Sequence, residues 1–196
     1  MNQIRLYVEG DPSLRQGFAK FFSGGKERCP IKIIPCGGID ETWKCFCGDW
    51  LHHPDAICLL LVDTDCSVSA SPRQHLLQQK GWKHDASHDD RYHLMVQLME
   101  AWFLADPDAL AEYYGKGFRA NVLTTSGDVE MISKQDVEER LGKATSETTK
   151  GSYLKHKRRH SVDLLQKIDP RKVRLRAPHC DRLLAKLERL VTTLGT

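Results

Sequence analysis

Three acidic side chains directly follow two stretches that have the composition of buried strands. Glu9 follows the run 4–8, and Asp63 and Asp65 follow the apolar run 56–62. In an open parallel α/β sheet, side chains just past the carboxyl ends of the strands converge on one crevice. Carboxylates that meet there repel one another unless a cation intervenes, and clustered acidic oxygens suit a hard ion. Although a lone Asp-x-Asp indicates little, the three together predict a site for Mg²⁺, or Mn²⁺, held by Glu9, Asp63 and Asp65.

A second feature is a segment with a strong excess of positive charge. Residues 150–176 carry 10 basic and 2 acidic side chains, whereas residues 1–149 carry 16 basic and 22 acidic ones. Such clusters bind the phosphates of nucleic acids, although many are only solvated helix faces. We expect nucleic acid, either DNA or RNA, as a partner of this segment. The side chains expected to contact it are Lys150, Lys155, Lys157, Arg158 and Arg159.

The order of strand and helix patterns predicts an α/β fold, with a parallel sheet flanked by helices. Strands are expected at 4–8, 31–35, 56–62 and 92–97, and helices at 12–23, 40–51, 72–80 and 99–105. Every residue of 56–62 is apolar, as in a central strand that is covered on both faces. Asp11 and Ser71 can each cap a helix, and each is followed by a proline that suits its first turn.

The rest of the chain reads as helical. Asp106 and Pro107 restart a helix, and residues 116–130 read as a loop with one short strand at most. Helices are then expected at 133–141, 149–168 and 180–194, the second of them basic and the third amphipathic.

Cysteine content and hydropathy indicate the cellular setting. The seven cysteines are an odd number, and no secretory signal precedes them, so reduced thiols and a cytoplasmic location are expected. Cys45 and Cys47 with His52 and His53 are the only zinc-like grouping, and buried thiols are the favoured interpretation. The longest apolar run has seven residues, far below the ~20 that span a membrane. No membrane association is expected.

Two further groups are expected to serve structure rather than chemistry. One is an acidic and imidazole cluster, which we interpret as a solvated loop rather than a ligand site: His88, Asp89, Asp90 and His93. The other comprises tyrosines for which core packing is favoured over stacking on bases: Tyr113, Tyr114 and Tyr153. Trp102, in an apolar segment, is expected in the core.

The sequence also resembles a known fold family. Val8-Glu9-Gly10 and Leu60-Leu61-Val62-Asp63-Thr64-Asp65 are similar to the signature of the Toprim fold, which topoisomerases, primases and the overcoming-lysogenization-defect nucleases share. The stretch 93–106 further looks like that of an uncharacterised bacterial family of Toprim-like proteins, whose members often lie beside ATPase genes in antiphage islands. The resemblance covers most of the chain. It implies a Toprim-like α/β core, residues 1–115, and a basic helical extension packed on it, residues 116–196.

The resemblance implies roles for individual side chains. Glu9 would act as a general acid or base or as a metal ligand, and Asp63 and Asp65 would hold Mg²⁺ against a phosphate of the substrate. Glu100 resembles an additional acidic residue that some Toprim nucleases use for a second metal, although it also suits a helix N-terminus. Lys150 or Lys155 would neutralise charge in the transition state, and Lys155 is the one assigned to catalysis.

These expectations define a function and its rivals. We expect a Mg²⁺-dependent nuclease, or a phosphodiester-processing subunit, of a bacterial antiphage system. A catalytically silent nucleic-acid-binding or toxin-like subunit of an ATPase complex is the main alternative, and a phosphoesterase acting on a nucleotide is a third. The sequence leaves the identity of an ATPase partner and a homo-oligomeric state open.

Overall fold

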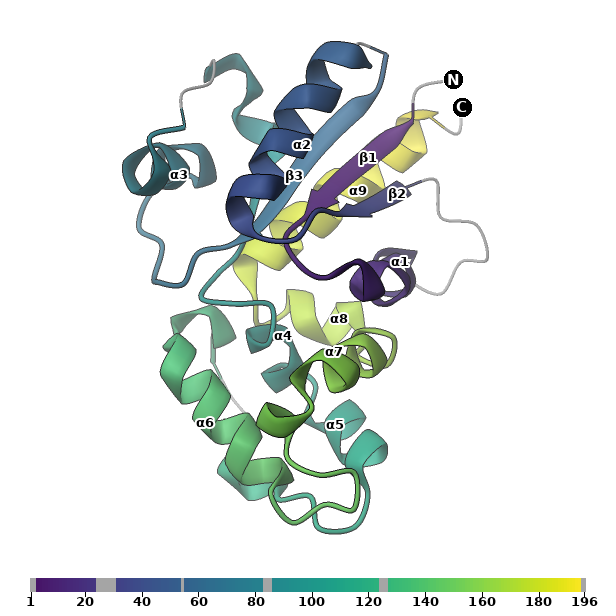
Figure 1. Ribbon diagram of the computed structural model, residues 1–196, viewed down its shortest axis with the longest axis vertical. Helices are drawn as coiled ribbons and strands as arrows, with labels where there is room; N and C mark the ends of the chain where they lie inside the picture. The colour runs from purple at the N-terminus through teal and green to yellow at the C-terminus, as the bar shows by residue number, and fades with distance from the viewer. Residues whose placement is uncertain (1–2, 24–30, 54, 83–85, 124–126, 195–196) are drawn as a thin grey trace.

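The computed structural model describes residues 3–23, 31–53, 55–82, 86–123 and 127–194. It confirms the predicted fold class, because its four strands form one all-parallel sheet in the order β2-β1-β3-β4 (Figure 1). The strands are β1 (Ile4–Val8), β2 (Ile31–Pro35), β3 (Ile57–Asp63) and β4 (Tyr92–Met95). β3 is an interior strand, paired with β1 and β4, as its apolar composition predicted.

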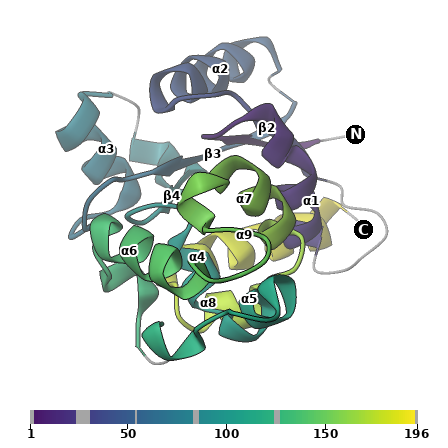
Figure 2. The same ribbon diagram turned by 60° about the horizontal axis from the view of Figure 1, so that its bottom comes forward.

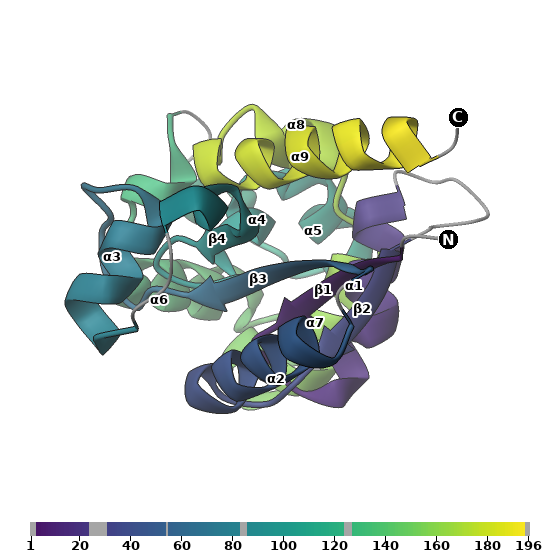
Figure 3. The ribbon, with the colours of Figure 1, turned by 90° about the horizontal axis from the view of Figure 1, so that it is seen from above.

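Alternate residues of β3 face two separate hydrophobic clusters, one on each side of the sheet. Leu59 and Leu61 pack with the helices α1 (Arg15–Ser23) and α9 (Pro178–Leu194). Leu60 packs instead with α2 (Ile39–His52) and α3 (Pro72–Lys80). Figure 3 shows the resulting layers, with α9 on one side of the sheet and α2 on the other. This arrangement explains why the strand is apolar at every position rather than at alternate ones.

The remaining helices gather at the end of the sheet toward which the strands point (Figure 1, Figure 2). They are α4 (Ala101–Leu104), α5 (Pro107–Tyr114), α6 (Lys134–Thr145), α7 (Lys157–Leu165) and α8 (Pro170–Arg174). Short 3₁₀ turns connect or precede the elements: η1 (Pro12–Leu14), η2 (Ala86–Arg91), η3 (Ala120–Val122), η4 (Val129–Met131) and η5 (Tyr153–Lys155). One hydrophobic cluster contains side chains from before and after residue 115, and the division at that residue stays a prediction.

Buried aromatic residues join the sheet to these helices. Trp102 of α4 is fully buried, as expected, and stacks on Phe21 of α1 with ring centroids 5.2 Å apart. Gly17 of α1 faces α7 so closely that a Cβ there would lie 2.8 Å from Leu165 Cβ. A side chain at position 17 would therefore push α7 away from the sheet.

Three predicted elements differ from the structure. The basic helix begins at Lys157 rather than 149, because Gly151 has a left-handed φ of +84° and Tyr153 turns into the core. The fourth strand ends at Met95 rather than 97, since Gln97 has a φ of +63° that no strand accommodates. In the described part of 116–130, the chain forms the turns η3 and η4 and no strand.

Several expectations about individual residues can be compared with the structure. Tyr113, Tyr114 and Tyr153 are buried, which confirms their structural role. The six cysteines among the described residues are free, and Cys29 lies outside that part of the chain. Within the described residues, Cys45, Cys47, His52 and His53 form no group that could hold a metal ion. No helix in the described ranges combines the length and apolar character that crossing a membrane requires.

The His88–His93 cluster is solvated only in part, because its two aspartates are exposed partners of ion pairs whereas His93 is buried. Asp89 pairs with Arg73 and Asp90 with Lys186. His93 is 1% exposed, and its Nδ1 lies 3.2 Å from Nη1 of Arg182. Burial, reinforced by the charge of Arg182, lowers the pKa of His93 to about 3. The folded protein therefore keeps His93 neutral.

This neutral histidine predicts an acid-dependent loss of stability. Between the ordinary pKa of 6.5 and about 3, the unfolded chain binds a proton on His93 that the folded chain excludes. The free energy of unfolding then decreases by about 1.4 kcal/mol for each pH unit below that ordinary value, and the contribution is fully present above it. His93→Gln should remove this slope in urea denaturation, whereas His52→Gln, at an exposed position, should retain it. An unchanged slope in His93→Gln would assign the acid sensitivity to other groups.

Candidate functional site

Two of the predicted carboxylates lie at the carboxyl ends of adjacent strands and line one pocket. Glu9 follows β1 and Asp63 ends β3, and the backbone N–H of Asp63 donates to Oε2 of Glu9 at 3.0 Å. The N–H of Met99 donates to Oδ1 of Asp63, also at 3.0 Å. The pocket has a volume of about 580 Å³, and its lining also includes Glu100. The structure therefore brings Glu9, Asp63 and Glu100 to one place.

The protein surroundings disfavour negative charge on two of these side chains. Burial raises the pKa of Asp63 well above its ordinary value, and repulsion from Glu100 and Glu9 adds to the effect. Burial likewise raises the pKa of Glu9 to about 7, although the hydrogen bond from Asp63 acts in the opposite direction. Perturbed carboxyl groups that share a pocket are typical of functional sites. A cation placed among them would relieve both the repulsion and the burial cost.

Glu100 is held by residues of the helices that gather at the end of the sheet. We call this part of the molecule, α4 to α8 with the turns between them, the helical half. Its side chain is buried, and Oη of Tyr153 donates to its Oε1 at 2.8 Å. Nζ of Lys157 lies 3.1 Å from the same oxygen, and Ser161 Oγ lies 2.7 Å from the Tyr153 hydroxyl. Nζ of Lys157 also lies 3.2 Å from Oε1 of Glu138. Burial lowers the pKa of Lys157, but Glu100 and Glu138 together raise it above its ordinary value. Lys157 is therefore a firmly charged ammonium at the pocket.

Asp65, the third predicted ligand, lies outside the pocket lining. Its backbone has a φ of +55°, and its N–H donates to the carbonyl of Gln97 at 2.9 Å. The exposed carboxylate accepts a hydrogen bond from Nζ of Lys134 at 2.6 Å. Asp65 still contributes to the electrostatics of the site, because its charge raises the pKa of Glu9. In this structure it is paired with a lysine rather than directed at the other two carboxylates.

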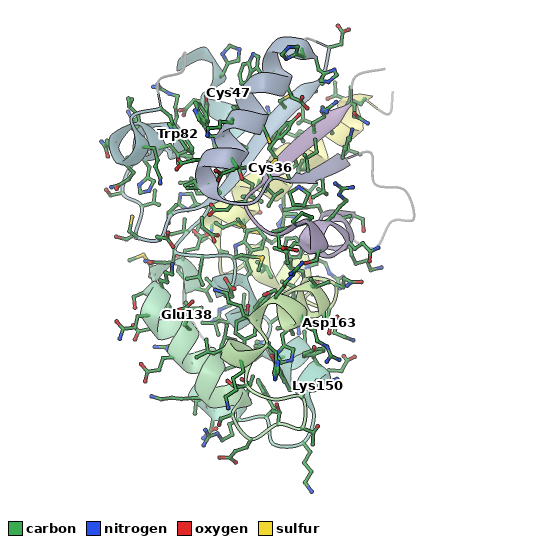
Figure 4. The ribbon with its side chains drawn as sticks, in the orientation of Figure 1. Cys36, Cys47, Trp82, Glu138, Lys150 and Asp163 are labelled. Atoms are coloured by element: carbon green, nitrogen blue, oxygen red, sulfur yellow. The ribbon has the colours of Figure 1, made fainter. Side chains whose placement is uncertain are left out.

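The five predicted phosphate-binding residues divide between different places. Lys157 and Arg158 line the acidic pocket, where Arg158 pairs with Asp11 at 3.0 Å. Lys155 and Arg159 line a neighbouring groove that also includes Lys157 and Arg158. Lys150 lies farther along the helical half, with its ammonium 4.7 Å from the ring centroid of Tyr113 (Figure 4). The structure thus places Lys157, rather than Lys155 or Lys150, at the carboxylates.

Most other cations of the basic segment neutralise carboxylates of the same chain. One of them, Lys172, places its ammonium 2.8 Å from Asp106, which is buried and caps α5, so the role of Asp106 is structural. The histidine of the basic run, His160, is also internal: it is buried and lies 2.9 Å from the hydroxyl of Tyr114. Further ion pairs are Lys167–Glu112, Arg171–Asp169, Lys172–Asp108, Arg174–Asp181 and Arg174–Glu188. Within the described residues, Lys155 and Arg159 have no ion-pair partner.

The donor set of the pocket fits a hard divalent ion in its chemistry. Glu9, Asp63 and Glu100 supply carboxylate oxygens, the ligands that Mg²⁺ and Mn²⁺ prefer, and the pocket leaves room for water. In the conformation described, no three acidic, histidine or cysteine side chains of the described residues form a group arranged to hold a metal ion. Binding would therefore require the carboxylates to move toward one another.

Sequence reasoning missed the lysine and tyrosine that hold Glu100. Lys157 was grouped with the general phosphate-binding residues, because nothing in its local sequence separates it from Lys155. Tyr153 was assigned only to packing. Their spacing does contain a signal, since Tyr153, Lys157 and Ser161 follow one another at intervals of four residues. Such intervals place side chains on one face of a helix, although the structure uses a turn and a helix instead.

Comparison with known proteins identifies the family but gives no function. The fold and pocket define a Rossmann-like α/β protein with an acidic site at the carboxyl edge of its sheet. Residues 13–188 match the family described as a domain of unknown function, DUF4276, and the chain belongs to that family. The match includes Asp63, Glu100 and Lys157 and begins after Glu9. No curated protein and no solved structure matches the chain.

The geometry predicts an unequal contribution of the carboxylates to metal binding. Glu9→Gln and Asp63→Asn should each weaken Mg²⁺ or Mn²⁺ binding by at least about tenfold, since each removes a charge from the pocket. Asp65→Asn should weaken it less, because Asp65 is paired with Lys134 outside the pocket. Titration calorimetry on the folded variants measures the difference. An equally large loss in Asp65→Asn would instead support the sequence-based set of ligands.

Proposed function

We propose that the protein is a metal-dependent nuclease whose centre consists of Glu9, Asp63 and Glu100 with Lys157. The observation that carries this proposal is the meeting of acidic and basic side chains in one pocket at the carboxyl edge of the sheet. Its lining contains four carboxylates, of which Asp11 is paired with Arg158, and two cations, Lys157 and Arg158. Carboxylates suit a divalent ion, and the cations suit the phosphate that it would bind. A bound divalent ion would act there as a Lewis acid on phosphoryl oxygens.

The chain's own residues supply the remaining parts of a phosphodiester cleavage. Glu9, which lines the pocket, would either hold the divalent ion or accept a proton from an attacking water. The N–H of Met99 holds the carboxylate of Asp63 in the pocket. Lys157, whose ammonium lies beside Glu100 in the pocket, stabilises negative charge that develops on the phosphate. This role replaces the one that the sequence assigned to Lys155.

The wider setting rests on the sequence resemblance. The relation to Toprim nucleases, the antiphage role and an ATPase partner are proposed together with the nuclease activity, and DNA and RNA both remain candidate substrates. One observation favours the alternative of a catalytically silent subunit. Lys157 and Lys134 already neutralise Glu100 and Asp65, so the acidic edge has internal counter-ions without a metal.

Cleavage assays on folded variants distinguish these two functions. With Mg²⁺ or Mn²⁺ and single-stranded, duplex and structured nucleic acids, the parent protein should form products, and Glu9→Gln and Asp63→Asn should reduce the rate at least about 100-fold. Glu139→Gln, which alters an exposed ion pair on α6, serves as a matched control and should keep full activity. Activity that survives in both site variants, or no activity in the parent, contradicts the nuclease proposal.

The two lysines should differ in the kinetic parameter that they affect. Lys157→Met should lower kcat by about 10²- to 10³-fold, because it removes a cation from the reacting phosphate. Lys155→Met should mainly raise KM, since Lys155 lies in the neighbouring groove. Lys157→Arg should restore part of kcat. If Lys155→Met lowered kcat as strongly as Lys157→Met, the original assignment of Lys155 would be correct.

A further inference from the structure

A groove adjoins the acidic pocket on the other side of Lys157 and Arg158. It has a volume of about 620 Å³, within the range of about 300–1,000 Å³ typical of small-ligand sites. Lys157 and Arg158 contribute to the lining of both the groove and the acidic pocket. A ligand phosphate held by these two residues would therefore lie at the junction of the groove and the pocket. Ser13 of η1 lies on one side of the groove, and residues of η5 and α7 line the rest.

The lining of this groove combines an apolar surface with a positively charged rim. Leu154, 50% exposed, and Val162 supply the apolar part. Lys155 and Arg159 lie on the rim and have no ion-pair partner among the described residues, while His156 is exposed beside them. The single carboxylate among the lining residues, Asp163 (labelled in Figure 4), accepts a hydrogen bond from Tyr113 at 2.7 Å.

We propose that this groove is a subsite for one unpaired nucleotide next to the phosphate that is cleaved. A nucleotide has the matching chemistry, since its base offers a flat apolar face and its phosphates carry negative charge. Leu154 and Val162 contact the face of the base, and Lys155 and Arg159 bind the flanking phosphate. The inference rests on the proposed function, because the phosphate held by Lys157 and Arg158 is the one at the acidic pocket.

The subsite determines the class of substrate. A base within a duplex is stacked and paired, and it cannot enter a separate groove without the free-energy cost of unstacking. This cost is small for a nucleotide in a single strand, a loop or a frayed end. The protein should therefore bind single-stranded nucleic acid more tightly than the same sequence in a duplex. Contacts with base faces are tolerant of sequence, so the preference is for strandedness and not for a motif.

Binding by an inactive chain tests this inference apart from cleavage. The probe is a fluorescent, mixed-sequence single strand, as DNA and as RNA, beside the same strand in a blunt duplex, bound to Asp63→Asn protein and followed by anisotropy. The single strand should bind about tenfold more tightly than the duplex. A nucleoside monophosphate should displace it at lower concentration than inorganic phosphate does. Equal affinity for single strand and duplex, or equal competition by phosphate, overturns the subsite.

Variants in the same background separate the apolar contact from the charges. Leu154→Ala should weaken single-strand binding about three- to tenfold without changing its dependence on salt, whereas Arg159→Ala should also make the salt slope shallower by about one unit. Leu175→Ala is the matched control, because Leu175 is 83% exposed on the turn after α8, outside the groove. If Leu154→Ala behaves like Leu175→Ala, the groove does not hold a base.

The two proposals fail in different experiments. A protein that cleaves nucleic acid but binds single strand and duplex equally is a nuclease without this subsite. A protein that prefers single strands through Leu154 but never cleaves them has the subsite without the activity, as the silent-subunit alternative requires. Melting curves of each variant, compared with the Asp63→Asn parent, verify that an effect on binding does not come from unfolding.

Discussion

Negative charge collected at one edge of a parallel sheet must be compensated, and this requirement shapes the rest of the molecule. Asp63 lies between Glu9 and Glu100, and burial with mutual repulsion raises its pKa. The compensation comes from residues far along the chain: Lys157 reaches Glu100, Arg158 reaches Asp11 and Lys134 reaches Asp65. The helical half is thus positioned by the charges of the strand ends as well as by its hydrophobic contacts.

The same need for charge compensation explains much of the positive charge in the basic segment, residues 150–176. Its excess of positive charge suggests a broad surface for nucleic acid, yet Lys167, Arg171, Lys172 and Arg174 pair with carboxylates of the same chain. The pair of Arg174 with Asp181 ties α8 to α9, and the pair of Lys172 with Asp106 ties α8 to the start of α5. The cations left for an external phosphate are concentrated at the start of α7, beside the acidic pocket. Charge composition therefore indicates how the two halves assemble as well as what they bind.

Sequence patterns predicted the sheet and part of the candidate site, for identifiable reasons. Burial on both faces makes β3 apolar throughout, so Asp63 stands out where the strand ends. Asp65 follows the same apolar run two residues later, so the sequence signal is the same for both aspartates. The left-handed backbone of Asp65 and its ion pair with Lys134 depend instead on how distant parts of the chain meet. The contact of Lys157 with Glu100 joins residues 57 positions apart. Local composition contains no information about such a contact. The left-handed φ of Gly151 and the burial of Tyr153 delay the start of the basic helix to Lys157.

The position of α9 has a consequence for synthesis of the protein on the ribosome. This helix covers one face of the sheet, yet it begins 83 residues after β4 ends. All four strands and α1 emerge well before α9, which completes the cover of that face, and α7 emerges between them. A growing chain therefore exposes apolar strand residues and an unfinished acidic edge until α9 has emerged. The acidic edge and its cations can come together only after α7 has emerged, and until α9 follows the apolar strand residues are open to aggregation.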